Sequence, residues 1–359
     1  MRKFYWAIIL FSVLTGSALW NVLQGQEVES TKYKFSEQGL VKTAYMCDST
    51  SRELVVLRPE VVFKGKYEVD TETGQSRFSI RNSRLGIVGN LSKLISYKFL
   101  LELSSDGKFN VLDLYAKINP FKGFSVTFGQ CSIPLYNGYT ISPGPLDYAN
   151  RPFVGKYFES TRDIGINVNY VIKQTGFPIA VEAGLYNGSG INNPKWETSP
   201  SYGGRILFGD MKKGFRSTVK TYLTKKADTL DLIYWGADLR YQGRNFKIES
   251  EVMGKYNKYN EKAMFATYVQ GGYLFPLKSK TFRGVEPVLR WDAMGYDITD
   301  RGLGVNRATG GVNLIFNTKP FTSILRVNYE HYFRNYSMKE FTSDEMDHSK
   351  VTLELLIYF

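Results

Sequence analysis

The chain has 359 residues, a formal net charge of +12 and a mean hydropathy of −0.26. Beyond its N-terminal segment, no stretch approaches the roughly 20 apolar residues that a spanning helix needs, which excludes a helix-bundle membrane protein. Aromatic residues make up 15% of the chain and 33 residues are glycine, which suits strands whose two faces differ in character. Because no linker or shift in composition divides the chain after residue 54, we expect one large all-β unit.

The first residues predict a secretory signal peptide over 1–25. Two basic residues are followed by the apolar run Phe4–Leu14 and then by small residues up to Ala18. The run is short for a membrane anchor, and the small residues are typical of a cleavage site, which we place after Ala18 or nearer Gly25. The polar residues 26–53 that follow are interpreted as a lead-in on the periplasmic side of the membrane.

After the lead-in, the sequence consists of about sixteen segments in which apolar and polar residues alternate, each close to the length of a tilted spanning strand. In "GFSVTFG", for example, Phe124, Val126 and Phe128 share one face of a strand. Short and long connections tend to alternate, as in outer-membrane barrels with short periplasmic turns and longer extracellular loops, and 275–284 is an exception. The short connections are 119–123, 209–214, 241–245 and 317–321, and the long ones are 131–161, 187–201, 295–306 and 334–347.

The final segment, "VTLELLIYF", places its odd-numbered residues from Val351 to Phe359 on one apolar face. In outer-membrane barrels the last strand typically ends in an aromatic residue that the assembly machinery binds, and this strand closes the barrel against the first. Closure matters because an open edge in lipid leaves backbone groups unpaired, at a cost of several kcal/mol each. We therefore predict an all-β, transmembrane antiparallel β-barrel of about 16 strands over 54–359. A secreted β-sandwich, whose strands also alternate, is the alternative.

The opposite strand faces line the predicted lumen, where basic and acidic residues nearly balance. Opposed charges are typical of a wet channel, and about 16 strands leave an aqueous lumen. The segment 131–161 lacks alternation and is rich in aromatic residues and prolines, so we expect it to fold into the lumen as a constriction loop. Its cations Arg151 and Lys156, with Arg162 beside it, outnumber its two acidic residues. This excess and the overall charge favour anions at the constriction.

Several motifs resemble a known family. "GQCSIPL" (129–135), "STRDIGI" (160–166) and "YNGSGINN" (186–193) follow one another in the order and spacing of the porin O/P family of phosphate- and polyphosphate-selective outer-membrane porins, and "RNSRLGIVG" (81–89) is similar to its second strand. The chain is identified as a Bacteroidetes-type member of this family. The resemblance implies trimers of sixteen-stranded barrels whose third extracellular loop, here 131–161, constricts the pore. It also implies lumenal arginines, of which Arg81 and Arg162 fall on motif positions.

The function predicted from these features is passive diffusion of small hydrophilic solutes through a porin in the outer membrane of a Gram-negative bacterium. We expect a preference for anions, and both a broad preference and phosphate or polyphosphate selectivity stay open. No metal, cofactor or enzymatic activity is expected. The expected partners are small anions and hydrophilic solutes, outer-membrane lipid, the barrel-assembly machinery through Phe359 and two further copies in a homotrimer, with no nucleic acid. The cations expected at the constriction and in anion binding are Arg81, Lys98, Lys117, Arg151, Lys156, Arg162, Arg205, Arg216 and Lys220.

Two other classes of function also stay open. An adhesin or receptor barrel would bind its ligand through the extracellular loops, which are modest in length. A barrel enzyme would have to use His331 and His348, the two histidines of the chain, which flank one loop near Asp344, Asp347 and Ser349. No motif surrounds either histidine, so a channel is favoured.

Overall fold

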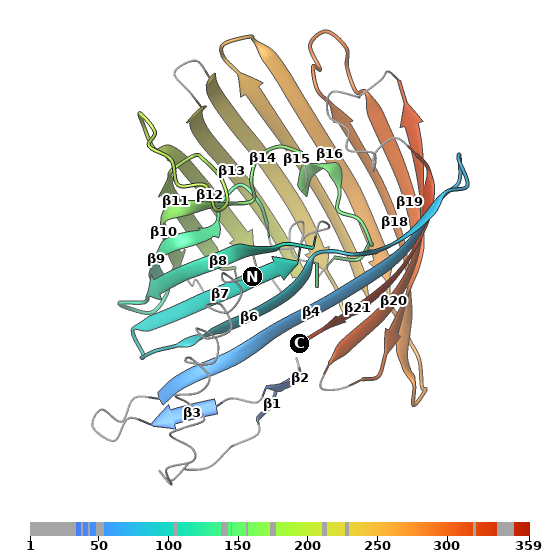
Figure 1. Ribbon diagram of the computed structural model, residues 1–359, viewed down its shortest axis with the longest axis horizontal. Coiled ribbons are helices and arrows are strands. Elements are labelled where there is room, and N and C mark those ends of the chain that lie inside the picture. Colours follow the sequence, from blue (N-terminus) through green and yellow to red (C-terminus); the bar gives the residue numbers. More distant parts are fainter. Residues whose placement is uncertain are drawn as a thin grey trace, which may run out of the picture.

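The strands of the protein form a closed antiparallel β-barrel in the computed structural model (Figure 1). The structure describes residues 34–36, 39–41, 44–47 and 54–359, apart from 104–106, 138–142, 145, 156, 173–176, 210–213, 227–229, 319–320 and 336–347. The predicted signal peptide therefore lies outside the described residues, as does most of the predicted lead-in. Within the described residues, no helix is both long and apolar enough to cross a membrane.

Three short strands precede the first long one. They are β1 (Lys34–Ser36) and β2 (Gly39–Val41), which pair with each other, and β3 (Ala44–Cys47), which pairs with the start of β4. The strands of the first half of the barrel are β4 (Leu54–Asp70), β5 (Ser76–Ile80), β6 (Ser83–Asn90), β7 (Ile95–Leu103), β8 (Phe109–Ile118), β9 (Phe124–Ser132), β10 (Arg162–Ile172), β11 (Ile179–Tyr186) and β12 (Ser201–Gly209).

The second half continues the same up-and-down order. Its strands are β13 (Gly214–Lys226), β14 (Leu230–Gln242), β15 (Phe246–Asn257), β16 (Lys262–Tyr273), β17 (Phe275–Pro276), β18 (Phe282–Gly295), β19 (Val305–Phe316), β20 (Thr322–Arg334) and β21 (Lys350–Tyr358). A single 3-10 turn, η1 (Phe153–Gly155), is the one helical element among the described residues.

Sixteen spanning strands result when two interrupted strands are each counted once, over the part of the chain that the structure describes. Both β5 and β6 pair with β4, and they are separated by Asn82, whose φ of 57° is left-handed. Both β16 and β17 pair with β18, so the predicted long turn 275–284 begins with a short extension of the β16–β18 hairpin. The strand count predicted from the sequence is confirmed.

The barrel closes where β21 pairs with β4, from Lys350 opposite Asp70 to Tyr358 opposite Val62. Beyond these pairs, the Phe359 N–H donates to the Val61 carbonyl at 3.1 Å, and the Val61 N–H donates to the Phe359 carbonyl at 3.2 Å. No backbone edge therefore stays open at this seam, which a sheet in lipid requires. We call the end of the barrel at which Phe359 lies the turn rim, and the end at which Asp70 and Lys350 lie the loop rim.

The alternation predicted from the sequence matches the two faces of the wall. On β21, Val351, Leu353 and Leu355 are exposed on the outside, whereas Thr352 and Glu354 are fully buried on the inside. The same holds around the barrel, where large apolar residues form the exposed outer face of most strands. This arrangement is the outward apolar band and polar interior of an outer-membrane barrel.

The segment between β9 and β10 occupies part of the interior (Figure 1, green). It comprises residues 133–161, two fewer than predicted at its start, because β9 continues to Ser132. Its apolar side chains pack against tyrosines and methionines of the inner wall. This interior cluster contains Ile133, Leu135, Tyr136, Phe153, Val154 and Phe158 of the segment and Tyr186, Tyr222, Tyr234, Met253, Met264 and Tyr268 of the wall. We call residues 133–161 the inner loop.

Candidate permeation pathway

The inner loop is attached to the wall by side chains that donate hydrogen bonds to its carbonyl oxygens. Lys64 donates to the Ala149 carbonyl at 2.8 Å, and Arg307 donates to the Arg151 carbonyl at 2.8 Å. Three further donors reach the neighbouring carbonyls of residues 146, 147 and 150. We call the five donors to carbonyls of residues 146–151 the anchor side chains: Lys64 on β4, Arg290 on β18, Arg307 and Asn313 on β19, and Arg326 on β20. Arg205 on β12 also donates to the loop, at the Tyr136 carbonyl (2.9 Å).

Wall carboxylates lie behind the anchor side chains and hold them in place. Arg307 forms a bidentate pair with Asp292, at 2.5 and 2.9 Å, and a further hydrogen bond to Glu330 at 3.2 Å. Glu354 accepts from Arg326 at 2.6 Å and pairs with Lys64 at 3.0 Å. Because these groups are buried and paired with one another, the network fixes the loop backbone.

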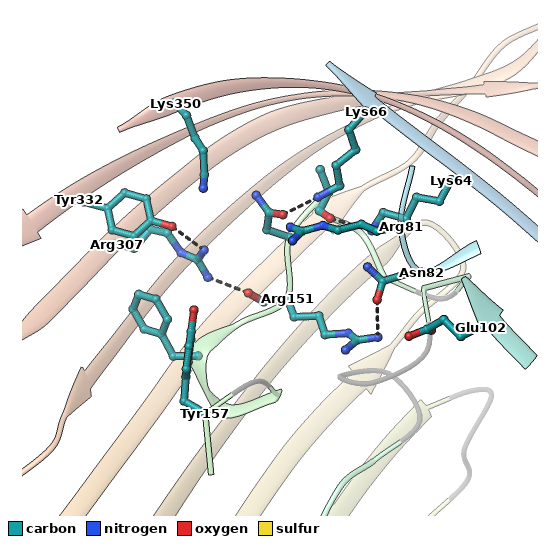
Figure 2. Close-up of a pocket in the computed structure, with 13 residues that line it drawn as sticks. Lys64, Lys66, Arg81, Asn82, Glu102, Arg151, Tyr157, Arg307, Tyr332 and Lys350 are labelled. Atoms are coloured by element: carbon teal, nitrogen blue, oxygen red, sulfur yellow. Dashed lines mark hydrogen bonds between the residues drawn. The ribbon is translucent and has the colours of Figure 1, made fainter. Parts of the chain in front are cut away.

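A cavity with a volume of about 250 Å³ lies between the inner loop and the wall near the loop rim (Figure 2). We call it the cationic cavity, because six of its lining residues are cations and one is a carboxylate. It is lined by Lys64, Lys66, Arg81, Asn82, Glu102, Ala149, Asn150, Arg151, Phe153, Tyr157, Arg307, Tyr332 and Lys350. The close-up shows Arg151 reaching across it from the inner loop toward Asn82 and Glu102.

The carboxylates near the cationic cavity are shared by several cations. Glu354 lies 2.6 Å from Arg326 and 3.0 Å from Lys64, but 3.9 Å from Lys66. Glu330 similarly lies 3.2 Å from Arg307 and 3.9 Å from Lys350. Of these contacts, the anchor side chains make the short ones, and Lys66 and Lys350 make the long ones. A positive potential in the cavity follows from this arrangement.

Arg151 is the one loop cation that the structure shows in the cationic cavity. Its guanidinium donates to the Asn82 side-chain oxygen at 3.4 Å, and Asn82 is placed there by the left-handed turn between β5 and β6. Burial lowers the pKa of Arg151 to about 10, which still leaves the group charged at neutral pH.

A second cavity of about 360 Å³ lies against β4 and β6 to β12. We call it the paired cavity, because each of its three carboxylates lies in a short ion pair. The Lys98 ammonium lies 3.0 Å from the Glu60 carboxylate and 3.3 Å from that of Asp113. Asp113 also pairs with Arg162, at 2.6 Å. Arg205 pairs with Glu182, at 2.6 Å. The paired cavity is lined by Glu60, Arg84, Lys98, Asp113, Tyr115, Lys117, Thr127, Cys131, Ser132, Arg162, Asn167, Asn169, Glu182 and Arg205.

The structure separates the cations predicted from the sequence into groups. Arg81 and Arg151 line the cationic cavity, whereas Lys98, Lys117, Arg162 and Arg205 line the paired cavity. Arg216 and Lys220 line neither of these cavities. Lys156 lies outside the described residues.

Arg216 and Lys220 instead belong to a buried network on the wall. Arg216 donates to Asp238 at 2.8 Å, and Lys220 pairs with Asp238 at 3.4 Å and with Glu251. Asn137 of the inner loop also donates to Glu251, at 3.3 Å, so this network contacts the loop through Glu251.

The sequence prediction missed the residues that complete the cationic cavity. Lys64 and Lys66 lie on β4, Lys350 on β21 and Arg307 on β19. Lys66 and Lys350 share a cavity only because β21 pairs with β4, with Glu354 opposite Lys66 and Lys350 opposite Asp70. Aligning the last predicted strand with the first would have indicated that Lys66 and Lys350 lie close together.

Comparison with known proteins agrees with this geometry. Residues 57–200 match the model of the phosphate-selective porin O and P family. Over these residues the chain is similar to the porin O and P family. The predicted resemblance is confirmed, and the family match together with the barrel makes the chain an outer-membrane porin, a channel rather than an enzyme. No curated protein matches the chain in sequence.

Solved porin structures share the fold at low sequence identity. The outer membrane channel DcaP of Acinetobacter baumannii has 16% identity and a TM-score of 0.59, over 85% of this chain and 97% of that one. An anion-selective porin from Comamonas acidovorans has 13% identity and a TM-score of 0.55, over 85% of this chain and 99% of that one. The trimer form of OmpT from Vibrio cholerae has 11% identity and a TM-score of 0.57, over 85% of this chain and 99% of that one.

Proposed function

We propose that this porin lets small hydrophilic solutes diffuse across the outer membrane and that it prefers anions at the cationic cavity. The observation that carries the anion preference is the excess of cations there, with six cationic residues and one carboxylate in the lining. In a confined and partly dehydrated space, such charges act more strongly than in bulk water, so they select the ions that enter. The paired cavity then receives the solute on the way to the turn rim.

Further parts of the proposal concern the inner loop and the assembled protein. We propose that residues 131–161 constrict the pore, supported by the hydrogen bonds that attach the inner loop to the wall. We also propose a homotrimer, supported by the trimer form of the structural neighbour OmpT. Residues 1–25 are proposed to direct export, 26–53 to form a periplasmic lead-in and 54–359 to form the barrel. Phe359 is proposed to bind the barrel-assembly machinery.

Replacing Arg81, Arg151 and Lys350 with Gln should move ion preference toward cations. These three residues line the cationic cavity without being anchor side chains, so the hydrogen bonds from the anchor side chains to the loop are kept. We expect the anion-to-cation permeability ratio to fall by roughly one order of magnitude, as the local anion concentration falls. The reversal potential across a planar bilayer in a potassium chloride gradient measures this ratio.

The matched control removes the same charge from the turn rim. Lys278, Lys280 and Arg283 are exposed there, and replacing all three with Gln should leave the reversal potential almost unchanged. Charges on a rim are screened by salt within about 8 to 10 Å. Equal shifts in both triple variants would show that the diffuse charge of the whole protein, and not the cationic cavity, sets ion preference.

A further inference from the structure

The cationic cavity has a second wall that a simple inorganic anion does not use. Tyr157 and Tyr332 lie on one side of it, and Lys64, Lys66 and Arg81 lie on the other (Figure 2). A third aromatic ring, that of Phe153, also lines the cavity. The ring centroids of Phe153 and Tyr157 are 6.1 Å apart, and those of Phe153 and Tyr332 are 6.4 Å apart. The rings therefore form one continuous aromatic face.

This aromatic face is held rigidly by the network that anchors the inner loop. The Arg307 guanidinium lies 4.5 Å from the centre of the Phe153 ring and 5.5 Å from that of Tyr332. The Phe153 N–H donates to Asp292 at 3.1 Å, and the Tyr332 hydroxyl lies 3.1 Å from Arg307. Phe153 and Tyr332 are buried by these contacts, whereas Tyr157 is only half-buried. Tyr157 is thus the most exposed of the three rings that line the cavity.

The two walls differ in what they can bind. Cations attract the oxygens of an anion, and an aromatic ring attracts a planar apolar body by stacking or edge contact. The cavity volume of about 250 Å³ is about eight times the share of one water molecule in liquid water, which leaves room for a ring beside a phosphate group. With six cations in the lining, a dianion interacts more favourably than a monoanion.

We propose that the cationic cavity preferentially binds phosphate monoesters that carry a planar ring, with the phosphate toward Arg81, Arg151 and Lys66 and the ring against Tyr157. This inference rests on the proposed anion-preferring function and adds to it a preference for the organic part of the solute. Inorganic phosphate or a phosphate ester without a ring uses the cationic wall alone. The ring-bearing ester uses both walls.

Block of chloride current in planar bilayers tests the proposal, with phenyl phosphate and methyl phosphate as probes. The two probes carry the same ionic group and differ in the ring. Phenyl phosphate should reach half-block at a concentration about fivefold lower than methyl phosphate, as one aromatic contact predicts. Tyr157→Ala should bring the two concentrations together by weakening phenyl phosphate alone, and Tyr157→Phe should retain the difference.

Two controls complete the experiment. Tyr259→Ala removes an exposed ring from the turn between β15 and β16 and should leave the difference intact. Arg81→Gln with Arg151→Gln should weaken block by both probes to a similar extent. Heat-modifiable mobility on unboiled gels confirms that each variant is a folded barrel.

The outcomes separate the inference from the function on which it rests. Equal half-blocking concentrations in the unsubstituted protein, with the reversal potential still favouring anions, would overturn the ring preference and leave the porin proposal standing. An unchanged difference in Tyr157→Ala would also overturn it. A reversal potential that favours cations in the unsubstituted protein would overturn the proposed anion preference itself.

Discussion

Replacing Phe359 with Asp is expected to remove most of the assembled protein from the outer membrane. The Phe359 ring packs edge-on against the Phe321 ring, with the two ring centroids 5.1 Å apart. The Phe359 backbone makes the last two hydrogen bonds of the β21–β4 seam. An Asp at this position loses the ring contact and places a charge next to lipid, which opposes the pairing that closes the barrel. Heat-modifiable mobility of membrane fractions on unboiled gels measures the folded amount.

Two variants distinguish the seam from a general effect of charge at the turn rim. Phe177 is similarly exposed before β11 at the same rim, and Phe177→Asp should reduce assembly much less. Phe359→Trp keeps an aromatic ring and should assemble nearly normally. If Phe359→Asp and Phe177→Asp yield the same amount of folded barrel, the contribution of Phe359 to closure is refuted.

Replacing Arg307 with Met is expected to detach the inner loop and raise single-channel conductance. The variant loses the hydrogen bond to the Arg151 carbonyl and leaves Asp292 without its bidentate partner. Removing one partner of a buried ion pair costs about 3–5 kcal/mol, which exceeds what one or two of the remaining loop hydrogen bonds contribute. Single-channel recording in planar bilayers should show a larger and noisier conductance.

The control is the same substitution at an exposed arginine of β20. Arg334 pairs with Glu72 at 2.9 Å at the loop rim, where both side chains are accessible to solvent, and such pairs contribute about 0–1 kcal/mol. Arg334→Met should therefore conduct like the unsubstituted protein. Arg307→Lys keeps the charge but not the bidentate geometry, and we expect an intermediate conductance. A folded Arg307→Met barrel with normal conductance would show that this anchor does not position the loop.

The face of each residue could be predicted from the sequence, because side chains of a strand alternate with a period of two. This rule placed Val351, Leu353 and Leu355 outside and Glu354 inside, as the structure shows. The inner loop was also predictable, since a long aromatic-rich segment without alternation cannot be a spanning strand. The predicted start at Cys131 was two residues early because Cys131 and Ser132 still pair with Asp163 and Arg162 on β10.

The height of each residue along the pore could not be predicted, because alternation does not determine the stagger between strands. Arg216 and Arg81 are both inward cations in the sequence, but register places Arg216 beside Asp238 and leaves Arg81 in the cationic cavity. Lys66 and Lys350 are far apart in the chain and meet only through the closing pair of strands. Ion pairing across strands is therefore a property of the register that composition alone does not contain.

Lys64 and Arg307 each have two roles, since each holds the inner loop and also lines the cationic cavity. A substitution at either position changes the bore of the pore and its charge in one step, so neither property can evolve there independently of the other. Arg81 and Lys350 line the cavity and are not anchor side chains. Adaptation to a different solute is therefore expected to begin at these two positions, where a substitution changes ion preference and leaves the width of the pore unchanged.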